Sequence, residues 1–245
     1  DVSGRPRISV HSFVVDIAGT RTVVDAGVGN GKMRDNPAWN NLDTDYPQRL
    51  HQAGIAPTSV KRVINTHLHR DHVGWNTTRR DRRWEPTFPA ASYLVSRDEW
   101  DFWSSASLSE DQMRMFADSI TPIRRSDQLE VIRVGDVVEI SDGIELVSTP
   151  GHTPGHISVR VSSAGESALI SGDVLHHPTQ IADPCLSCAV DIDPALADRT
   201  RHQVLEALAN SETLLLGTHF THPTAGFVER TKTGYRYVGY PPEET

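Results

Sequence analysis

The sequence has few cysteines, no long apolar run and no excess of positive charge, and each absence excludes a class of protein. Its two cysteines, Cys185 and Cys188, lie in the segment CLSC, which lacks the second pair of a four-cysteine zinc site. No clear helix follows, as a thioredoxin-type redox pair would require, so we interpret both as incidental loop residues. Apolar runs such as TLLLG are too short to cross a bilayer, so no membrane span is predicted.

Negative charge dominates, with 32 Asp and Glu residues against 24 Lys and Arg and a formal net charge of −8. This charge would repel a phosphate backbone, so we predict no nucleic-acid partner. The 245 residues contain no linker or short repeat, which predicts a single domain over residues 1–245. We expect a cytoplasmic protein, although the first residue is Asp1 instead of Met, so a removed secretion signal stays open.

Strand and helix patterns alternate along the chain, which predicts an α/β protein built as two layered halves with helices outside. The segment ISVHSFVVDIAGTRTVVDAG (8–27) predicts an antiparallel hairpin, SVKRVINTHLH (59–69) a strand, and TLLLGTH (213–219) the final strand. Capping patterns predict three helix starts, namely Ser96 with Glu99, Ser107 with Glu110, and Asp193 with Pro194.

Histidine and aspartate are concentrated where predicted strands end. The segment VINTHLHRDHVGW (63–75) places His67, His69, Asp71 and His72 within six positions. In an extended segment His67 and His69 would project to the same side, and the two following residues lie on a turn. Three later predicted strands end in the same way, at His152, Asp173 and His219. Since strand ends at one sheet edge often form a site, imidazole and carboxylate there predict zinc, manganese or iron binding.

These segments resemble the metallo-β-lactamase superfamily of metal-dependent hydrolases. The matching motifs, in the family's order, are THLHRDH at 66–72, GHTPGH at 151–156, SGD at 171–173 and GTH at 217–219. The resemblance implies an αββα sandwich and two divalent metal ions, with Zn²⁺ as the first choice and Mn²⁺ or Fe²⁺ as alternatives. It implies a metal-bridging hydroxide as the nucleophile.

The resemblance also implies a ligand for each ion at seven positions, which we call the predicted ligand set. One ion is held by His67, His69 and His152, a second ion is held by Asp71, His72 and His219, and Asp173 bridges the two. Asp71 is also predicted to be catalytic. Every expected ligand is present in the sequence, which disfavours a binding module that has lost its activity.

Within the superfamily, the sequence is most similar to the branch of lactonases and methyl parathion hydrolase-like enzymes. Only residues 220–245 follow the last ligand, which is too few for the glutathione-binding helices of glyoxalase II-like enzymes, and zinc β-lactamases generally lack the bridging aspartate. We therefore predict a hydrolase of a small ester-like molecule, a lactone first. The alternatives are a phosphotriester or aryl ester hydrolase and a mononuclear iron sulfur dioxygenase. A loop-mediated homodimer would fit this branch.

His176 occupies a position, three residues after Asp173, at which the lactonases carry a tyrosine that assists at the substrate oxygen. An imidazole could donate a proton or a hydrogen bond to the leaving alkoxide, so we predict that His176 is catalytic. Asp25 resembles the carboxylate that orients metal ligands in this family, with a turn cap as an equal alternative. His156 is predicted to be a structural hydrogen-bonding partner, and His222 a surface residue.

Overall fold

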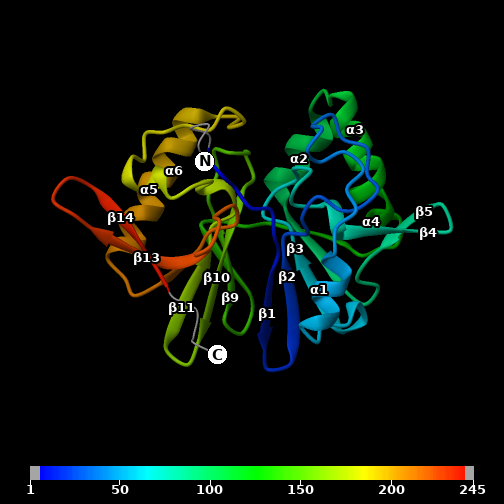
Figure 1. The fold of residues 1–245 in the computed structure, drawn as a ribbon, viewed down its shortest axis with the longest axis horizontal. Helices are drawn as coiled ribbons and strands as arrows, with labels where there is room; N and C mark the ends of the chain where they lie inside the picture. Colours follow the sequence, from blue (N-terminus) through cyan, green and yellow to red (C-terminus); the bar gives the residue numbers. More distant parts are fainter. Residues whose placement is uncertain (1–5, 241–245) are drawn as a thin grey trace. The chain divides into compact units, whose positions relative to one another are not determined.

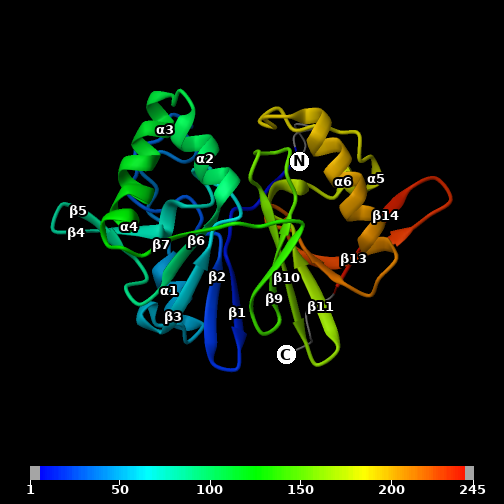
Figure 2. The same ribbon diagram turned by 180° about the vertical axis from the view of Figure 1, so that it is seen from behind.

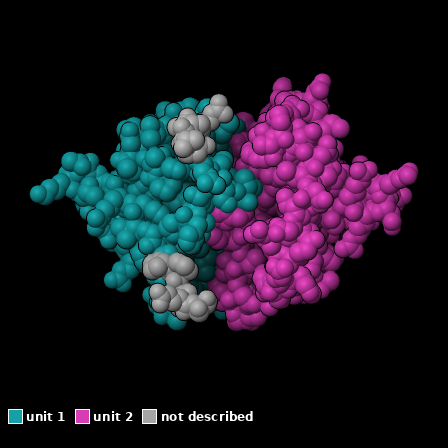
Figure 3. Space-filling model, in the orientation of Figure 1, with its two compact units in different colours: residues 1–10, 134–245 teal, residues 11–133 magenta. Residues whose placement is uncertain are grey.

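The computed structural model describes residues 6–240, and the chain divides into two compact units (Figure 3). Unit 1 comprises residues 1–10 and 134–245, and unit 2 comprises residues 11–133. Each unit contains a large β-sheet accompanied by helices (Figures 1 and 2). Among the described residues, no helix has the length and apolar character needed to cross a bilayer. A single domain over 1–245 stays a prediction.

Unit 2 is built on a five-stranded sheet whose order is β1-β2-β3-β6-β7. The predicted hairpin is confirmed, because β1 and β2 pair antiparallel across a turn at Ala18 and Gly19, which have φ angles of 50° and 79°. β2, β3, β6 and β7 run parallel. The bounds are β1 (Phe13–Ile17), β2 (Thr20–Val24), β3 (Val60–Ile64), β6 (Ser92–Ser96) and β7 (Leu129–Ile132). Their β-branched runs favour strands that are buried on both faces.

Short helices and a small hairpin complete unit 2. They are α1 (Tyr46–Gln52), η1 (Pro57–Ser59), η2 (Gly74–Asn76), β4 (Thr77–Arg80), β5 (Arg83–Pro86), α2 (Arg97–Ser105), α3 (Glu110–Met115), η3 (Phe116–Ile120) and α4 (Thr121–Arg125). Ser96 caps α2 as predicted, since its side chain accepts a hydrogen bond from the Glu99 amide. The second capping box was placed wrongly: Ser109 and Gln112 cap α3 reciprocally, instead of Ser107 and Glu110.

Unit 1 is built on a seven-stranded sheet with the order β14-β13-β12-β11-β10-β9-β8. Helix α6 (Pro194–Ala209) begins after the Asp193 cap, as predicted, and packs with α5 (Thr179–Ala182) and the turn η4 (Gly172–Val174). The prediction of a final strand at 213–219 was wrong, because two strands follow. The bounds are β8 (Val137–Ser141), β9 (Ile144–Ser148), β10 (Ile157–Ser163), β11 (Glu166–Ile170), β12 (Leu214–Leu216), β13 (Ala225–Arg230) and β14 (Tyr235–Gly239).

The strand predicted over 59–69 ends early, so two predicted ligands lie on a loop. β3 stops at Ile64, and His67 and His69 follow it without strand pairing. The Asn65 amide still donates to the Leu94 carbonyl of β6 at 3.0 Å. Beyond it, the Thr66 amide donates to Asp25 Oδ1 and the Leu68 amide to Glu99 Oε1, each at 2.8 Å, so these amides bond to side chains instead of to a strand. These side chains set the shape of the loop.

Candidate functional site

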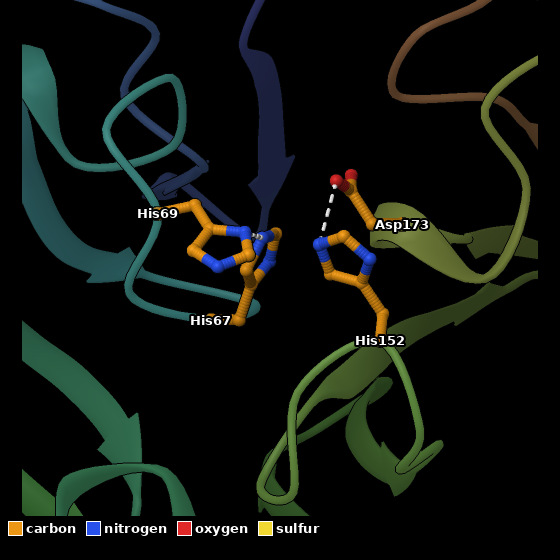
Figure 4. A group of neighbouring side chains, drawn as sticks. All are labelled: His67, His69, His152 and Asp173. Carbon is orange, nitrogen blue, oxygen red and sulfur yellow. Dashed lines mark hydrogen bonds and ion pairs between the residues drawn. The ribbon is translucent and has the colours of Figure 1, made fainter. Parts of the chain in front are cut away.

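In unit 2, His67 and His69 turn their ring nitrogens toward one another. His67 Nε2 lies 3.0 Å from His69 Nδ1, and Figure 4 shows both side chains leaving the loop after β3. Two nitrogen ligands of one tetrahedral ion would be about 3.3 Å apart, given metal–nitrogen distances of about 2.0–2.1 Å. The pair therefore has the spacing of two ligands of a single ion, and Thr66 Oγ1 contacts the other nitrogen of His67 at 3.0 Å.

Of the remaining two predicted ligands of unit 2, His72 is in contact with Asp25. Asp25 Oδ2 lies 2.9 Å from His72 Nδ1, so this ring donates its Nδ1–H to the carboxylate and keeps its lone pair on Nε2, the nitrogen predicted to bind metal. His72 Nε2 in turn lies 3.7 Å from Asp71 Oδ2. Asp25 has a left-handed φ of 55° at the end of β2, a conformation that aspartate tolerates better than most residues. Oδ2 of Asp25 thus faces His72, as an orienting carboxylate would, while Oδ1 accepts a hydrogen bond from the Thr66 amide, as a turn cap would. The orienting role stays a prediction.

In unit 1, Asp173 presents its two carboxylate oxygens to different histidines. Oδ2 lies 3.2 Å from His152 Nε2 and 3.2 Å from His176 Nε2, while Oδ1 lies 3.1 Å from His219 Nε2. Figure 4 shows His152 and Asp173 facing one another in this unit. A carboxylate can bridge two ions by offering one oxygen to each, and here each oxygen faces a histidine predicted for a different ion.

Two histidines of unit 1, His152 and His219, are each held by a partner on Nδ1. His152 Nδ1 lies 2.9 Å from Asp191 Oδ1, and His219 Nδ1 lies 2.8 Å from the carbonyl oxygen of Ser9. Both rings thus donate from Nδ1 and direct Nε2 toward Asp173, which is the usual tautomer of a metal-binding histidine. His156 accepts a hydrogen bond from the Asp173 amide at 2.9 Å and confirms its structural role.

Sequence reasoning missed Asp191. It lies 39 residues after His152 in the chain, and no motif surrounds it. Burial alone would raise the pKa of Asp191, but hydrogen bonds from His152 and from the Cys188 amide outweigh burial and lower the pKa. The ionised carboxylate is suited to support the His152 imidazole. Its only sequence signal was its place in the loop before α6, which does not distinguish it from a surface residue.

His176 shares its environment with Asp173 and Cys188. Burial alone would lower the pKa of the ring, but Asp173 and then Cys188 outweigh it and raise the pKa of His176 to about 10. The thiol of Cys188 is affected in return: burial would raise its pKa, whereas His176 lowers it. The two side chains therefore influence one another electrostatically, and the interpretation of Cys188 as an incidental loop residue stays a prediction. His176 also stacks on His219, with ring centroids 5.6 Å apart.

The donor set fits divalent metal ions. His67, His72, His152, Asp173 and His219 are at most 4% exposed, and Asp71 is 9% exposed. Such burial of imidazoles and carboxylates is costly unless each group is paired or coordinated. Three of the histidines also carry the Nδ1 partner typical of metal ligands. His222 is exposed, as predicted.

Comparisons with known proteins agree with this chemistry. Residues 5–219 match the model of the Metallo-beta-lactamase superfamily. The N-acyl homoserine lactonase AttM of Rhizobium radiobacter is 26% identical over 175 residues, which is 66% of this chain and 63% of AttM. The chain spans less than two thirds of the length of the first curated relatives that it matches.

Solved structures show the same fold. The hydrolase AbOPH, described as a member of the beta lactamase superfamily, is 25% identical with a TM-score of 0.81, covering 97% of this chain and 81% of that one. AidC, described as a dizinc quorum-quenching lactonase, has a TM-score of 0.82 over the same shares of the two chains at 20% identity. At that identity, the likeness to AidC concerns the fold alone.

Proposed function

The chain belongs to the metallo-β-lactamase superfamily, and from this we propose that it is a dinuclear metal-dependent hydrolase of a small ester-like substrate, a lactone first. The observation that carries the proposal is the Asp173 carboxylate, whose two oxygens face His152 and His219 separately. In a mononuclear site, neither the second Asp173 oxygen nor Asp71 and His72 would act as a metal ligand. This favours hydrolysis over the mononuclear iron dioxygenase.

Seven residues would hold the two ions. The first ion would be held by His67, His69 and His152, the second by Asp71, His72 and His219, and Asp173 would contribute to both. When bound, divalent ions would lower the pKa of water from about 15.7 to about 7, which supplies hydroxide at neutral pH, and would polarise the scissile carbonyl. Zinc is our first choice, because imidazole and carboxylate ligands without thiolate suit it, with Mn²⁺ or Fe²⁺ as alternatives.

The chain's own residues have three further tasks in this proposal. Asp25 and Asp191 orient His72 and His152 through their Nδ1 atoms. His176, whose side chain is 15% exposed, would donate an N–H to the alkoxide oxygen as the lactone C–O bond opens. This role needs only a donor at His176, and the imidazole has one in either protonation state.

A lactone is preferred because several relatives at modest identity are N-acyl homoserine lactonases. Lactone opening needs a nucleophile, a polarised carbonyl and a donor at the leaving oxygen, and the proposed residues provide for all three. A phosphotriester or aryl ester has the same three needs, so these substrates are the alternatives within hydrolysis.

Metal analysis and a substrate panel test the proposal on the same sample. We expect at least about two equivalents of zinc or manganese per chain, and turnover of N-acyl homoserine lactones above that of phosphotriesters, aryl esters and thioesters. If the protein holds two or more equivalents of metal but hydrolyses phosphotriesters faster than lactones, the proposed metal centre stands and the proposed substrate becomes a phosphotriester. One iron per chain with no hydrolysis of any panel member would overturn the proposal.

A further inference from the structure

A second group of metal-binding side chains lies in unit 1, outside the predicted ligand set. Ligand atoms of Cys185, Asp198 and His202 all lie within 4.8 Å of one another. Asp198 and His202 are four residues apart on α6, so they share a face of this helix. Cys185 comes from the segment between α5 and α6. The group therefore combines a thiol, a carboxylate and an imidazole from two parts of the chain.

The two helical side chains are arranged as metal ligands would be. His202 Nδ1 donates to the carbonyl oxygen of Asp198 at 2.9 Å, so the lone pair of the neutral ring lies on Nε2. Asp198 Oδ1 is enclosed although the side chain as a whole is 40% exposed; it lies 3.6 Å from His202 Nδ1, beyond hydrogen-bonding distance, and accepts no hydrogen bond from the part of the chain that the structure describes. An enclosed carboxylate oxygen without a donor is suited to a cation.

Cys185 is held beside α6 by hydrogen bonds on both sides of it. Arg201, on α6, donates from Nη1 to the Pro184 carbonyl at 2.6 Å. Gln180 donates from Nε2 to the Leu186 carbonyl at 2.8 Å. The Cys185 amide donates to Asp183 Oδ1 at 3.3 Å. The backbone that presents the thiol is therefore anchored, and a ligand there would not have to order a free loop.

We propose that Cys185, Asp198 and His202 form a zinc site that is separate from the predicted ligand set and that clamps the segment 183–191 to α6. A thiolate with imidazole and carboxylate suits the borderline-soft Zn²⁺ ion. At bond lengths of about 2.0–2.3 Å, tetrahedral ligand atoms lie about 3.3–3.8 Å apart, so the three groups must approach by up to about 1.5 Å. His202 is 44% exposed, which leaves room for that rotation and for water as the fourth ligand.

The clamped segment connects this site to the histidines of unit 1. It carries Asp191, which bonds to His152, and Cys188, which lies beside His176. Arg201 reinforces the connection, since its Nε donates to the Val174 carbonyl at 3.0 Å, one residue after Asp173. Zinc at Cys185 would thus restrict the loop that supports His152.

Cobalt titration of metal-free protein tests the site, because only a cysteine ligand gives a thiolate-to-cobalt charge-transfer band in the near ultraviolet. The predicted ligand set contains no cysteine, so its occupation is silent in this band. We expect the band to be complete by about three equivalents of cobalt per chain, because the predicted ligand set would take up about two. It should disappear in Cys185→Ser and persist in the matched control Cys188→Ser. His202→Gln and Asp198→Asn retain the thiol and should weaken cobalt binding in this band by roughly 10–100-fold or more.

Two outcomes would overturn the site. One is the absence of the band from the unaltered protein at saturating cobalt. The other is loss of the band in Cys188→Ser with retention in Cys185→Ser, which would assign the thiolate to the neighbourhood of His176. Hydrogen exchange tests separately whether zinc clamps the segment 183–191 to α6. With zinc bound, the amides of residues 185–190 should exchange more slowly in the unaltered protein than in Cys185→Ser. Equal exchange rates in the two proteins would overturn the clamp. None of these readouts depends on hydrolysis.

Discussion

At the residue scale, His152 is held from both sides by carboxylates, Asp173 at Nε2 and Asp191 at Nδ1. Asp191→Asn keeps an acceptor oxygen but removes the charge that makes the ring a better donor to a metal. We expect metal affinity to fall roughly 10–100-fold, with activity restored by excess metal. Isothermal titration with zinc measures this. Asp142→Asn, on an exposed turn of the same unit, is the control, and equal affinities in the two variants would contradict the role of Asp191.

The adjacent residue, His177, provides a control for substitution of His176. The same change from His to Phe at both positions alters charge and volume equally, so a difference in activity reports on chemistry. His176→Phe should keep both metal ions and lower kcat/KM by about 10²–10⁴-fold, since a positioned donor at the leaving oxygen contributes about that much. The same change at His177, which bonds only locally to Thr179 among the described contacts, should have little effect. Metal analysis and lactone kinetics check both variants. Unchanged kcat/KM in His176→Phe would remove this residue from the mechanism.

Lys32 is a fully buried cation in unit 2. Its Nζ donates to Thr77 Oγ1 at 2.8 Å and to Ser119 Oγ at 3.1 Å, and lies 3.3 Å from Asp118 Oδ1. It also lies 3.9 Å from the centre of the Trp84 ring. Burial lowers the pKa of Lys32 from 10.5 to about 8, although Asp118 opposes the shift. Folding therefore favours the neutral amine.

The depressed pKa of Lys32 predicts how stability changes with pH. Between pH 8 and 10.5, unfolded chains bind a proton at Lys32 that folded chains have released, so the free energy of unfolding rises with pH. Relative to Lys32→Met, which lacks the titration, the protein should gain roughly 3 kcal/mol from pH 7 to pH 11. Urea unfolding of both proteins at each pH measures the difference, and a difference that is constant with pH would contradict the prediction.

At the element scale, the turn after His72 packs backbone to backbone against the loop after β2. The Gly74 amide donates to the Gly27 carbonyl at 2.7 Å, and the Trp75 amide to the Ala26 carbonyl at 2.6 Å. A Cβ atom on Gly74 would lie 1.8 Å from the carbonyl oxygen of Val28. If either the turn at Gly74 or the loop after β2 moved to relieve this clash, the backbone at His72 would be displaced. Glycine is therefore required here by close approach.

Gly74→Ala tests this packing. We expect a loss of about 3 kcal/mol or more in the free energy of unfolding, because the clash is with backbone and no side-chain rotation relieves it. Gly135→Ala is the matched control, since a Cβ there would meet no atom within 4 Å. Thermal and urea unfolding measure both variants. A loss in Gly74→Ala no larger than in the control would contradict the packing argument.

Elements whose bounds depend on the local sequence pattern were predicted correctly. The prediction failed for elements whose bounds depend on contacts with distant residues. Alternating β-branched residues were enough for the hairpin at 13–24, and the Asp193 cap for α6. In SLSEDQ, however, both Ser107 and Ser109 have a suitable partner three residues on, and the helix begins at the second, placing Met115 in the core. β3 likewise ends at Ile64, and distant side chains, Asp25 and Glu99, bond to two of the amides beyond it.

The same distinction applies to the candidate site. The predicted ligands are contiguous in short motifs, so their residue types alone indicated metal binding. Asp191 and Cys188 come from a loop without a motif, and only folding brings them to His152 and His176. The orienting partner of His219 is the backbone carbonyl of Ser9, 210 residues away, and a carbonyl has no sequence signal.

At the scale of the whole molecule, the chain buries Asp25, Asp71, Asp173 and Asp191 in a protein with a net charge of −8. Buried carboxylates and imidazoles stabilise the folded chain only when they are paired or coordinated, and an unfolded chain holds no such arrangement of donors. Divalent ions should therefore bind the folded state preferentially. Metal supply would then control how much of the protein is folded as well as how much is active.

Removal of metal should accordingly lower the melting temperature. At free zinc 100 times above the dissociation constant, one site adds about 2.7 kcal/mol to the free energy of unfolding, or roughly 5–10 °C in Tm for a chain of this size. Asp173→Ala should lose most of this gain, because it removes a ligand from both proposed ions. Scanning calorimetry measures the Tm of each protein without metal and again after zinc is added. The rise in Tm is calculated separately for each protein, so any effect of the substitution on the metal-free fold cancels. An equal rise in Tm on reloading both proteins would show that Asp173 is not the shared ligand.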